Sequence, residues 1–156
     1  IENNIRFGRP GASREDVIRA AKMACCHSFI ESLPFGYETV VGEGGATLSG
    51  GEKQRISIAR AILKDAPIII LDEATANVDP ENEDKLRAAF EALTKNKTVI
   101  MIAHRLETIK KADQIAVING GGLESGTHEE LMEKNDVYRR FVRMREQAAD
   151  WTIVST

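Results

Sequence analysis

Two consecutive acids follow an unbroken apolar run near the middle of this chain. Residues 68–71 read Ile-Ile-Ile-Leu, and Asp72 and Glu73 come next. Such a run is typical of a strand buried on both faces of a parallel sheet, where ligands bind at the carboxyl ends of the strands. Successive strand residues point to opposite sides, so one carboxylate can hold Mg²⁺ or its water shell while the other orients an attacking water. The alternative is a pair of solvated acids, or a cap for the next segment of the chain.

A histidine ends the next predicted strand. That strand covers residues 98–103, and His104 follows it. A lone histidine is usually structural, but the end of a second strand should bring this one to the same sheet edge as Asp72 and Glu73. There it could contact a γ-phosphate oxygen or the attacking water.

A serine and two glycines begin a helix predicted at residues 50–64. Ser49 and Glu52 have the spacing of a capping box, which satisfies free N–H groups at a helix start. The same geometry suits a phosphate, because a helix N-terminus carries about +0.5 of a charge and unpaired N–H donors. Gly50 and Gly51 would let the phosphate approach the backbone. The two interpretations are compatible, and these four residues alone do not separate them.

The elements that must position these residues alternate between helices and strands. Further helices are predicted at about residues 13–33, 106–111 and 128–134, after Asp79-Pro80, and after a cap at Asp136. A third strand is predicted at residues 114–118, with a hairpin at Asn119-Gly120 that leads into Leu123. Thr127 and Glu130 form a second capping box. This order is typical of an α/β layer architecture with a helical part in front.

Apolar spacing predicts which faces of these helices are buried. The expected core positions are Val17, Ala21, Cys25 and Phe29; Ile56, Ala59 and Leu63; Leu86, Ala89, Phe90 and Leu93; and Val137, Phe141 and Met144. The tail from Trp151 is expected to fray.

The composition is that of a soluble globular protein. The net charge of −3 argues against a general nucleic-acid binder, which normally has a basic excess. No apolar run of 18 or more residues is present, so no membrane-spanning segment is expected. Cys25, Cys26 and His27 match no zinc spacing, and we favour a core position for the cysteines over a ligand role.

Taken together, these residues resemble the motifs of ATP-binding cassette (ABC) ATPases. Residues 48–55, LSGGEKQR, resemble the signature motif, and residues 70–75 resemble the Walker B motif with its catalytic glutamate. Residues 76–79, which end in Asp79, resemble the D-loop, and His104 resembles the switch histidine. Residues 39–45, from Thr39 to Gly45, and GTHEEL at residues 126–131 resemble stretches of ABC exporters.

The resemblance implies a fold and a domain organisation. The expected fold class is α/β: a partial P-loop NTPase (ABC ATPase) core with a largely parallel sheet, preceded by an α-helical subdomain. Residues 1–156 would form one partial nucleotide-binding domain. Its helical subdomain, with the signature motif, would span about residues 8–64, and the C-terminal half of the ATPase core about residues 65–156.

The resemblance also implies a role for each motif residue, with ATP and Mg²⁺ as the cofactors. Asp72 would hold Mg²⁺ through water, Glu73 and His104 would be catalytic, and the nucleotide would be bound by Ser49, Gly50, Gly51, Glu52 and Asp79. The expected partners are a second nucleotide-binding domain packed head to tail and, at residues 39–45, the transmembrane domain of an exporter. No nucleic acid is expected. The location would be the cytoplasmic face of the cell membrane, as part of an integral membrane transporter.

Some features depart from the family pattern. The phosphate loop G-x-x-x-x-G-K-[ST] is absent from this chain, since Gly51 stands where the lysine would follow Gly50. Glu52 stands where glutamine is common, and Asn77 and Val78 alter the D-loop. By the resemblance, Ile1 falls just after the Q-loop, so we expect a C-terminal part of the domain that is inactive alone. In the family, the lysine facing Ser49 comes from the partner domain.

An open strand edge is expected where the phosphate-loop strand would pair. Such an edge exposes unpaired backbone groups and favours self-association. Two alternatives to an exporter remain at this point. One is a soluble ABC-type ATPase that acts on DNA or ribosomes, and the other is a non-enzymatic interaction module.

Overall fold

The computed structural model describes residues 1–42, 46–72, 80–102 and 106–153. The chain forms two compact units, Ile1–Met101 and Ile102–Thr156. Within the described residues, no helix is both long and apolar enough to cross a membrane. The predicted subdomain boundary near residue 64 stays a prediction.

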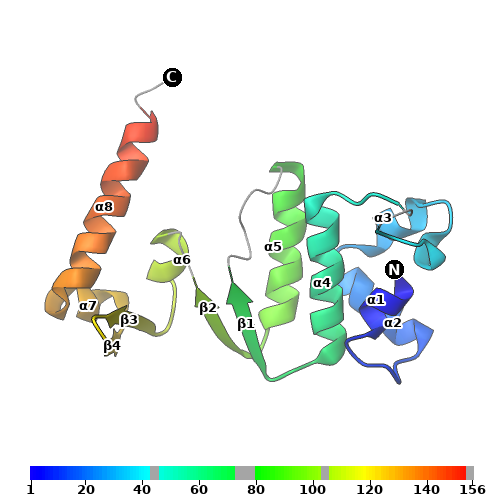
Figure 1. The fold of residues 1–156 in the computed structure, drawn as a ribbon, viewed down its shortest axis with the longest axis horizontal. Coiled ribbons are helices and arrows are strands. Elements are labelled where there is room, and N and C mark those ends of the chain that lie inside the picture. Colours follow the sequence, from blue (N-terminus) through cyan, green and yellow to red (C-terminus); the bar gives the residue numbers. More distant parts are fainter. Residues whose placement is uncertain (43–45, 73–79, 103–105, 154–156) are drawn as a thin grey trace. The chain divides into compact units, whose positions relative to one another are not determined.

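The first unit is helical at its start and then alternates between strands and helices (Figure 1). Its elements are α1 (Glu2–Arg6), α2 (Arg14–Met23), α3 (His27–Ser32), the 3₁₀ turn η1 (Gly36–Glu38), α4 (Gly50–Lys64), β1 (Ile68–Asp72), α5 (Pro80–Thr94) and β2 (Thr98–Ile102). Strands β1 and β2 are hydrogen-bonded neighbours and point in the same direction. This arrangement confirms the α/β class with a parallel pair.

Helix α4 is the centre of the first unit, because α1, α2 and α5 all pack against it. Its buried positions include Ile56, Ala59 and Leu63, as predicted. In α5, Leu86, Ala89 and Leu93 are buried, and Phe90 packs against the same core. The helical period therefore identified these two faces correctly.

The single helix predicted at residues 13–33 is wrong, because the chain breaks at Cys25. Cys25 has a left-handed φ of +52°. The backbone N–H of Cys26 donates to Ala21 O at 2.9 Å, and that of Cys25 donates to Lys22 O at 3.1 Å. These two bonds form a Schellman motif, in which glycine is the usual left-handed residue.

The break shifts the buried face of the second half by one residue. Cys26 and Ile30 are fully buried, whereas the predicted Cys25 and Phe29 are only half-buried. Burial raises the pKa of the Cys26 thiol to about 12, so this sulfur stays protonated at neutral pH. A position in the core is therefore confirmed for Cys26.

Strand β1 is not buried on both faces, contrary to the prediction from its apolar run. Ile69 is 7% exposed, but its neighbours Ile68 and Ile70 are 54% and 73% exposed. In β2, Ile100 and Ile102 are also more than half exposed. The run correctly predicts a strand, but burial of its second face depends on a covering layer, and no described element supplies one.

The second unit contains a hairpin and two helices after a short helix. Its elements are α6 (Leu106–Lys110), β3 (Ile115–Asn119), β4 (Gly122–Gly126), α7 (His128–Lys134) and α8 (Asp136–Ile153). The antiparallel strands pair from Ile115 with Gly126 to Asn119 with Gly122. Gly120 and Gly121 both have positive φ, as a two-residue type I′ turn requires. The predicted hairpin is confirmed, but its turn is at Gly120-Gly121 rather than at Asn119-Gly120.

Helix α8 differs from its prediction in its cap and its buried face. Asn135, rather than Asp136, caps it, since Asn135 Oδ1 accepts a hydrogen bond from Tyr138 N at 2.7 Å. Tyr138 and Val142 are buried, whereas Val137 and Met144 are 44% and 64% exposed. Phe141, the third predicted position, is half-buried and packs against this core. Residues 151–153, in the tail that we expect to fray, continue the helix.

Candidate functional site

The Ser49 turn is the best-defined part of the candidate site. Ser49 Oγ accepts a hydrogen bond from Glu52 N at 3.3 Å, and Ser49 N donates to Glu52 Oε2 at 2.8 Å. The Ser49 hydroxyl also donates to the same carboxylate oxygen at 2.9 Å. The predicted capping box is therefore confirmed, and it fixes the backbone at the start of α4.

This turn points away from the core while its flanks are anchored in it. Leu48 on one side and Arg55 and Ile56 on the other are buried, whereas Ser49 and Gly50 are exposed. A Cβ atom built on Gly50 would meet no atom within 4 Å. The N-terminus of α4 is thus open to a second molecule.

The end of β1 lies at the same end of the first unit as the Ser49 turn (Figure 1). Both strands run one way, and α4 and α5 run the opposite way. The carboxyl ends of the strands therefore share an end of the unit with the N-termini of the helices. Asp72, the last residue of β1, is exposed there. Its carboxylate is of the kind that Mg²⁺ takes as a ligand.

Three predicted site residues lie outside the described residues: Glu73, Asp79 and His104. Glu73 follows β1 directly, and Asp79 precedes α5. His104 comes two residues after the last residue of β2. Their roles therefore remain predictions. The support for them is sequence order, since each residue lies within two positions of the end of a described helix or strand.

The GTHEEL run at residues 126–131 has a structural basis. Thr127 and Glu130 form the predicted capping box of α7. A Cβ at Gly126 would lie 2.9 Å from Glu130 Oε2, so a side chain there would disturb the box. His128 Nδ1 lies 2.8 Å from the Tyr138 hydroxyl and links α7 to α8. Each of these four positions therefore helps to build the start of α7 or its contact with α8.

The environment of His27 is that of a structural histidine. Its Nδ1 lies 2.9 Å from the Tyr37 hydroxyl, and its Nε2 lies 3.2 Å from Glu31 Oε2. Both ring nitrogens are therefore occupied by protein groups. Among the described residues, no group of three or more His, Cys, Asp or Glu side chains has the arrangement of a metal site.

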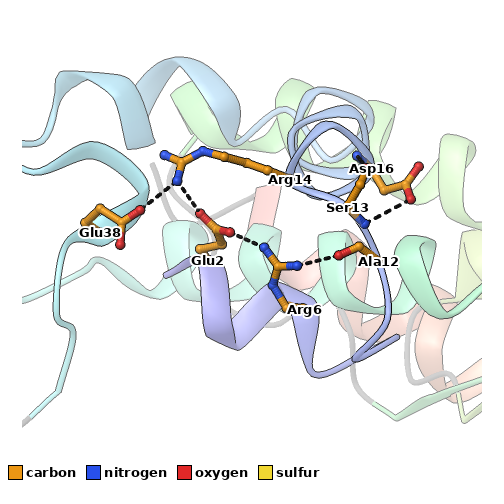
Figure 2. Close-up of polar contacts among 7 residues, drawn as sticks. All are labelled: Glu2, Arg6, Ala12, Ser13, Arg14, Asp16 and Glu38. Atoms are coloured by element: carbon orange, nitrogen blue, oxygen red, sulfur yellow. Dashed lines mark hydrogen bonds and ion pairs between the residues drawn. The ribbon is translucent and has the colours of Figure 1, made fainter.

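The structure brings together three charged residues that belong to no sequence motif. One of them directly precedes the 39–45 stretch. Glu2, Arg14 and Glu38 come from three separate segments and meet beside Thr39 (Figure 2). Their separations of 12 and 24 positions match no helix or strand period, so no sequence pattern could have identified them.

The chain is similar to known transport proteins. The family model described as "ABC transporter" matches residues 2–76. The chain is 52% identical over 141 residues to an ATP-dependent lipid A-core flippase of Chromobacterium violaceum, covering 90% of this chain and 24% of that protein. It is 51% identical over 147 residues to the same-named protein of Legionella pneumophila strain Paris, covering 94% and 25%.

The fold agrees with the sequence similarity. A bacterial Atm1-family ABC exporter, solved with ATP bound, aligns with a TM-score of 0.77 and 44% identity. The alignment covers 92% of this chain and 25% of that one. The chain thus spans about a quarter of the length of the relatives it matches. The matching family model, these relatives and this shared fold agree that the chain is similar to part of ABC transporters.

Proposed function

We propose that this chain is part of the nucleotide-binding domain of an ABC exporter, which hydrolyses ATP to drive export across a membrane. The observation that carries the proposal is the outward-facing, capped Ser49 turn at the same end of the unit as the carboxyl end of β1. The names of the relatives support an exporter over a soluble ABC-type ATPase. The site would lie on the cytoplasmic face of the membrane.

The described residues fit Mg²⁺ and ATP. Asp72 offers an exposed carboxylate, which would hold the metal through water. The backbone at Gly50 is open to a phosphate, because no atom lies within 4 Å of a Cβ built there. It lies next to the partial positive charge of the α4 N-terminus. Mg²⁺, when bound, would neutralise charge on the phosphates during transfer.

Each remaining motif residue has a proposed task. Glu73 polarises the attacking water, and His104 contacts the γ-phosphate. Ser49, Gly50, Gly51 and Glu52 bind the nucleotide held by a second, head-to-tail domain. Asp79 contributes the D-loop of the same interface. Positioning and charge neutralisation then supply most of the catalysis.

The stretch at residues 39–45 is proposed to contact the transmembrane part of the exporter. Val40 supports this role, because it is an apolar side chain that is 72% exposed beside the buried Thr39. The backbone N–H of Ala46 donates to Val40 O at 2.8 Å, so Val40 and Ala46 lie close together.

Substitutions of Ser49 separate the helix cap from the nucleotide contact. Ser49→Ala should lower the free energy of unfolding of the chain by about 1 kcal/mol, while Ser49→Asn should keep most of it because asparagine caps equally well. In the intact transporter, both should lower ATP hydrolysis by at least about tenfold, since neither supplies the hydroxyl. Urea denaturation and steady-state ATPase rates measure the two effects. Full activity of Ser49→Asn would mean that the serine acts only as a cap.

The 156-residue chain alone should not bind Mg-ATP in the micromolar range. It lacks the lysine and the N–H cradle of a phosphate loop, which supply much of the affinity for the phosphates. Isothermal titration calorimetry with Mg-ATP measures this directly. Micromolar binding would show that the described residues suffice for a nucleotide site.

A further inference from the structure

The segment that leads into the 39–45 stretch is held in place from several directions. We call residues 37–40 the loop root. Tyr37 and Thr39 are 6% and 4% exposed, and the backbone N of Ile1 donates to Thr39 O at 3.0 Å. The Tyr37 hydroxyl contacts His27 of α3. The loop root is therefore fixed on its inner side, while Val40 points outward.

An ion-pair chain ties the outer side of the loop root to α1 and α2 (Figure 2). Arg14 Nη1 lies 2.7 Å from Glu38 Oε1 and 3.0 Å from Glu2 Oε2. Arg6 pairs with the other oxygen of Glu2 and also donates to Ala12 O. One guanidinium thus bridges two carboxylates that lie 36 positions apart in the sequence.

The two carboxylates differ in their exposure to water. The Glu2 side chain is 12% exposed and forms ion pairs with Arg6 and Arg14, although its Oε2 accepts no hydrogen bond. The Glu38 side chain is 67% exposed, and its ion-pair partner in the described part of the chain is Arg14. Arg14 therefore links the exposed Glu38, next to Thr39, to the largely buried Glu2. A largely buried carboxylate such as that of Glu2 needs partners of opposite charge.

The position of Arg14 is itself fixed by the start of α2. Ser13 Oγ accepts a hydrogen bond from Asp16 N at 3.1 Å, and Ser13 N donates to Asp16 Oδ2 at 3.3 Å. This capping box places Arg14 at the first helical position. Beyond Glu2, α1 is joined to α4 by Arg60, whose Nε donates to Asn4 O at 2.7 Å. A continuous set of contacts therefore runs from the loop root to the helix that begins at the Ser49 turn.

We propose that Arg14 is a positioning residue that orients the loop root, and with it Val40, toward the transmembrane part of the exporter. The inference rests on the proposed function, because it takes the partner of the 39–45 stretch from there. Arg14 is not among the residues proposed to bind the nucleotide or to act on it. It acts through Glu38 and sets how firmly the loop root contacts its partner.

The test measures contact at Val40 in the intact transporter. Val40→Cys provides a thiol whose rate of labelling by a water-soluble maleimide reports whether the partner covers it, with the parent protein as the background for Cys25 and Cys26. Labelling should be slow in the intact transporter. Adding Arg14→Gln or Glu38→Gln should each raise the labelling rate by about fivefold or more, as expected for a coupling contact. The KM for ATP should stay within about twofold, because neither residue is in the nucleotide site.

Arg19→Gln is the matched control. Arg19 is also an arginine of α2 in an ion pair, but its partner Asp16 belongs to the same helix. Arg19→Gln should leave the labelling rate of Val40→Cys unchanged. If Arg14→Gln misfolds, Glu38→Gln still tests the proposal, because it leaves the ion pairs of Glu2 with Arg6 and Arg14 in place.

Two failures have different meanings. If Val40→Cys reacts as fast in the intact transporter as in the isolated chain, the proposed membrane-domain contact is wrong. If Val40→Cys is protected and neither Arg14→Gln nor Glu38→Gln changes its rate, the role of Arg14 is wrong and the proposed function stands. An equal rise with Arg19→Gln would also overturn the role of Arg14.

Discussion

Replacing Glu73 by glutamine in the intact transporter should lower the rate of ATP hydrolysis by at least about 100-fold. The amide has nearly the shape of the carboxylate but cannot accept a proton from the attacking water or polarise it as strongly. The affinity for Mg-ATP should remain within about twofold, because the lost interaction is one made in the transition state. Steady-state ATPase rates and equilibrium titration measure the two quantities.

Two comparisons make this prediction specific. Glu133→Gln removes a carboxylate from an exposed position of α7 and should leave the rate unchanged. Asp72→Asn should weaken the binding of Mg-ATP as well as its hydrolysis, since this acid is proposed to hold the metal. Wild-type hydrolysis by Glu73→Gln would contradict its catalytic role. A joint loss of binding and hydrolysis in Glu73→Gln would contradict the division of tasks between the two acids.

Local signals in the sequence predicted the elements that carry the candidate site. Helix α4 begins and ends where the capping box and the apolar period place it, at Gly50 and Lys64. Strand β1 ends at Asp72, one residue before Glu73, as the end of the apolar run indicated. These features depend on neighbours within a few positions, so one sequence is sufficient to find them.

Other features could not be predicted because their causes are not local. Nothing in the residue type of Cys25 indicates a left-handed conformation, which glycine normally provides. The exposure of Ile70 depends on which layers cover the sheet rather than on the strand itself. The meeting of Glu2, Arg14 and Glu38 requires three segments to be folded before their charges become neighbours.

Among the glycines for which the structure describes the surroundings, Gly8 has the least room for an added methyl group, because the segment after α1 packs closely against α4. A Cβ at Gly8 would lie 2.2 Å from Arg60 O and 3.2 Å from Arg60 C, which are backbone atoms inside a helix. The φ of Gly8 is not in the left-handed region, so steric contact alone opposes a side chain here. Gly8→Ala should therefore lower the free energy of unfolding by about 1–3 kcal/mol.

The mechanism of that loss is a separation of α1 from α4. Relief of the clash would move the segment away from Arg60, whose Nη2 donates to Asn4 Oδ1 at 2.9 Å and whose guanidinium lies 5.9 Å from the Phe7 ring centroid. Gly11→Ala is the matched control, because a Cβ there meets no atom within 4 Å, and it should change stability by no more than about 0.5 kcal/mol.

Urea denaturation of the 156-residue chain measures both variants through the midpoint at a common slope. Equal midpoints for Gly8→Ala and Gly11→Ala would contradict the close approach of Gly8 to α4. A lower midpoint for Gly8→Ala alone would confirm it. The same displacement would carry Glu2 away from Arg14, so Gly8→Ala should also loosen the loop root and speed the labelling of Val40→Cys in the intact transporter.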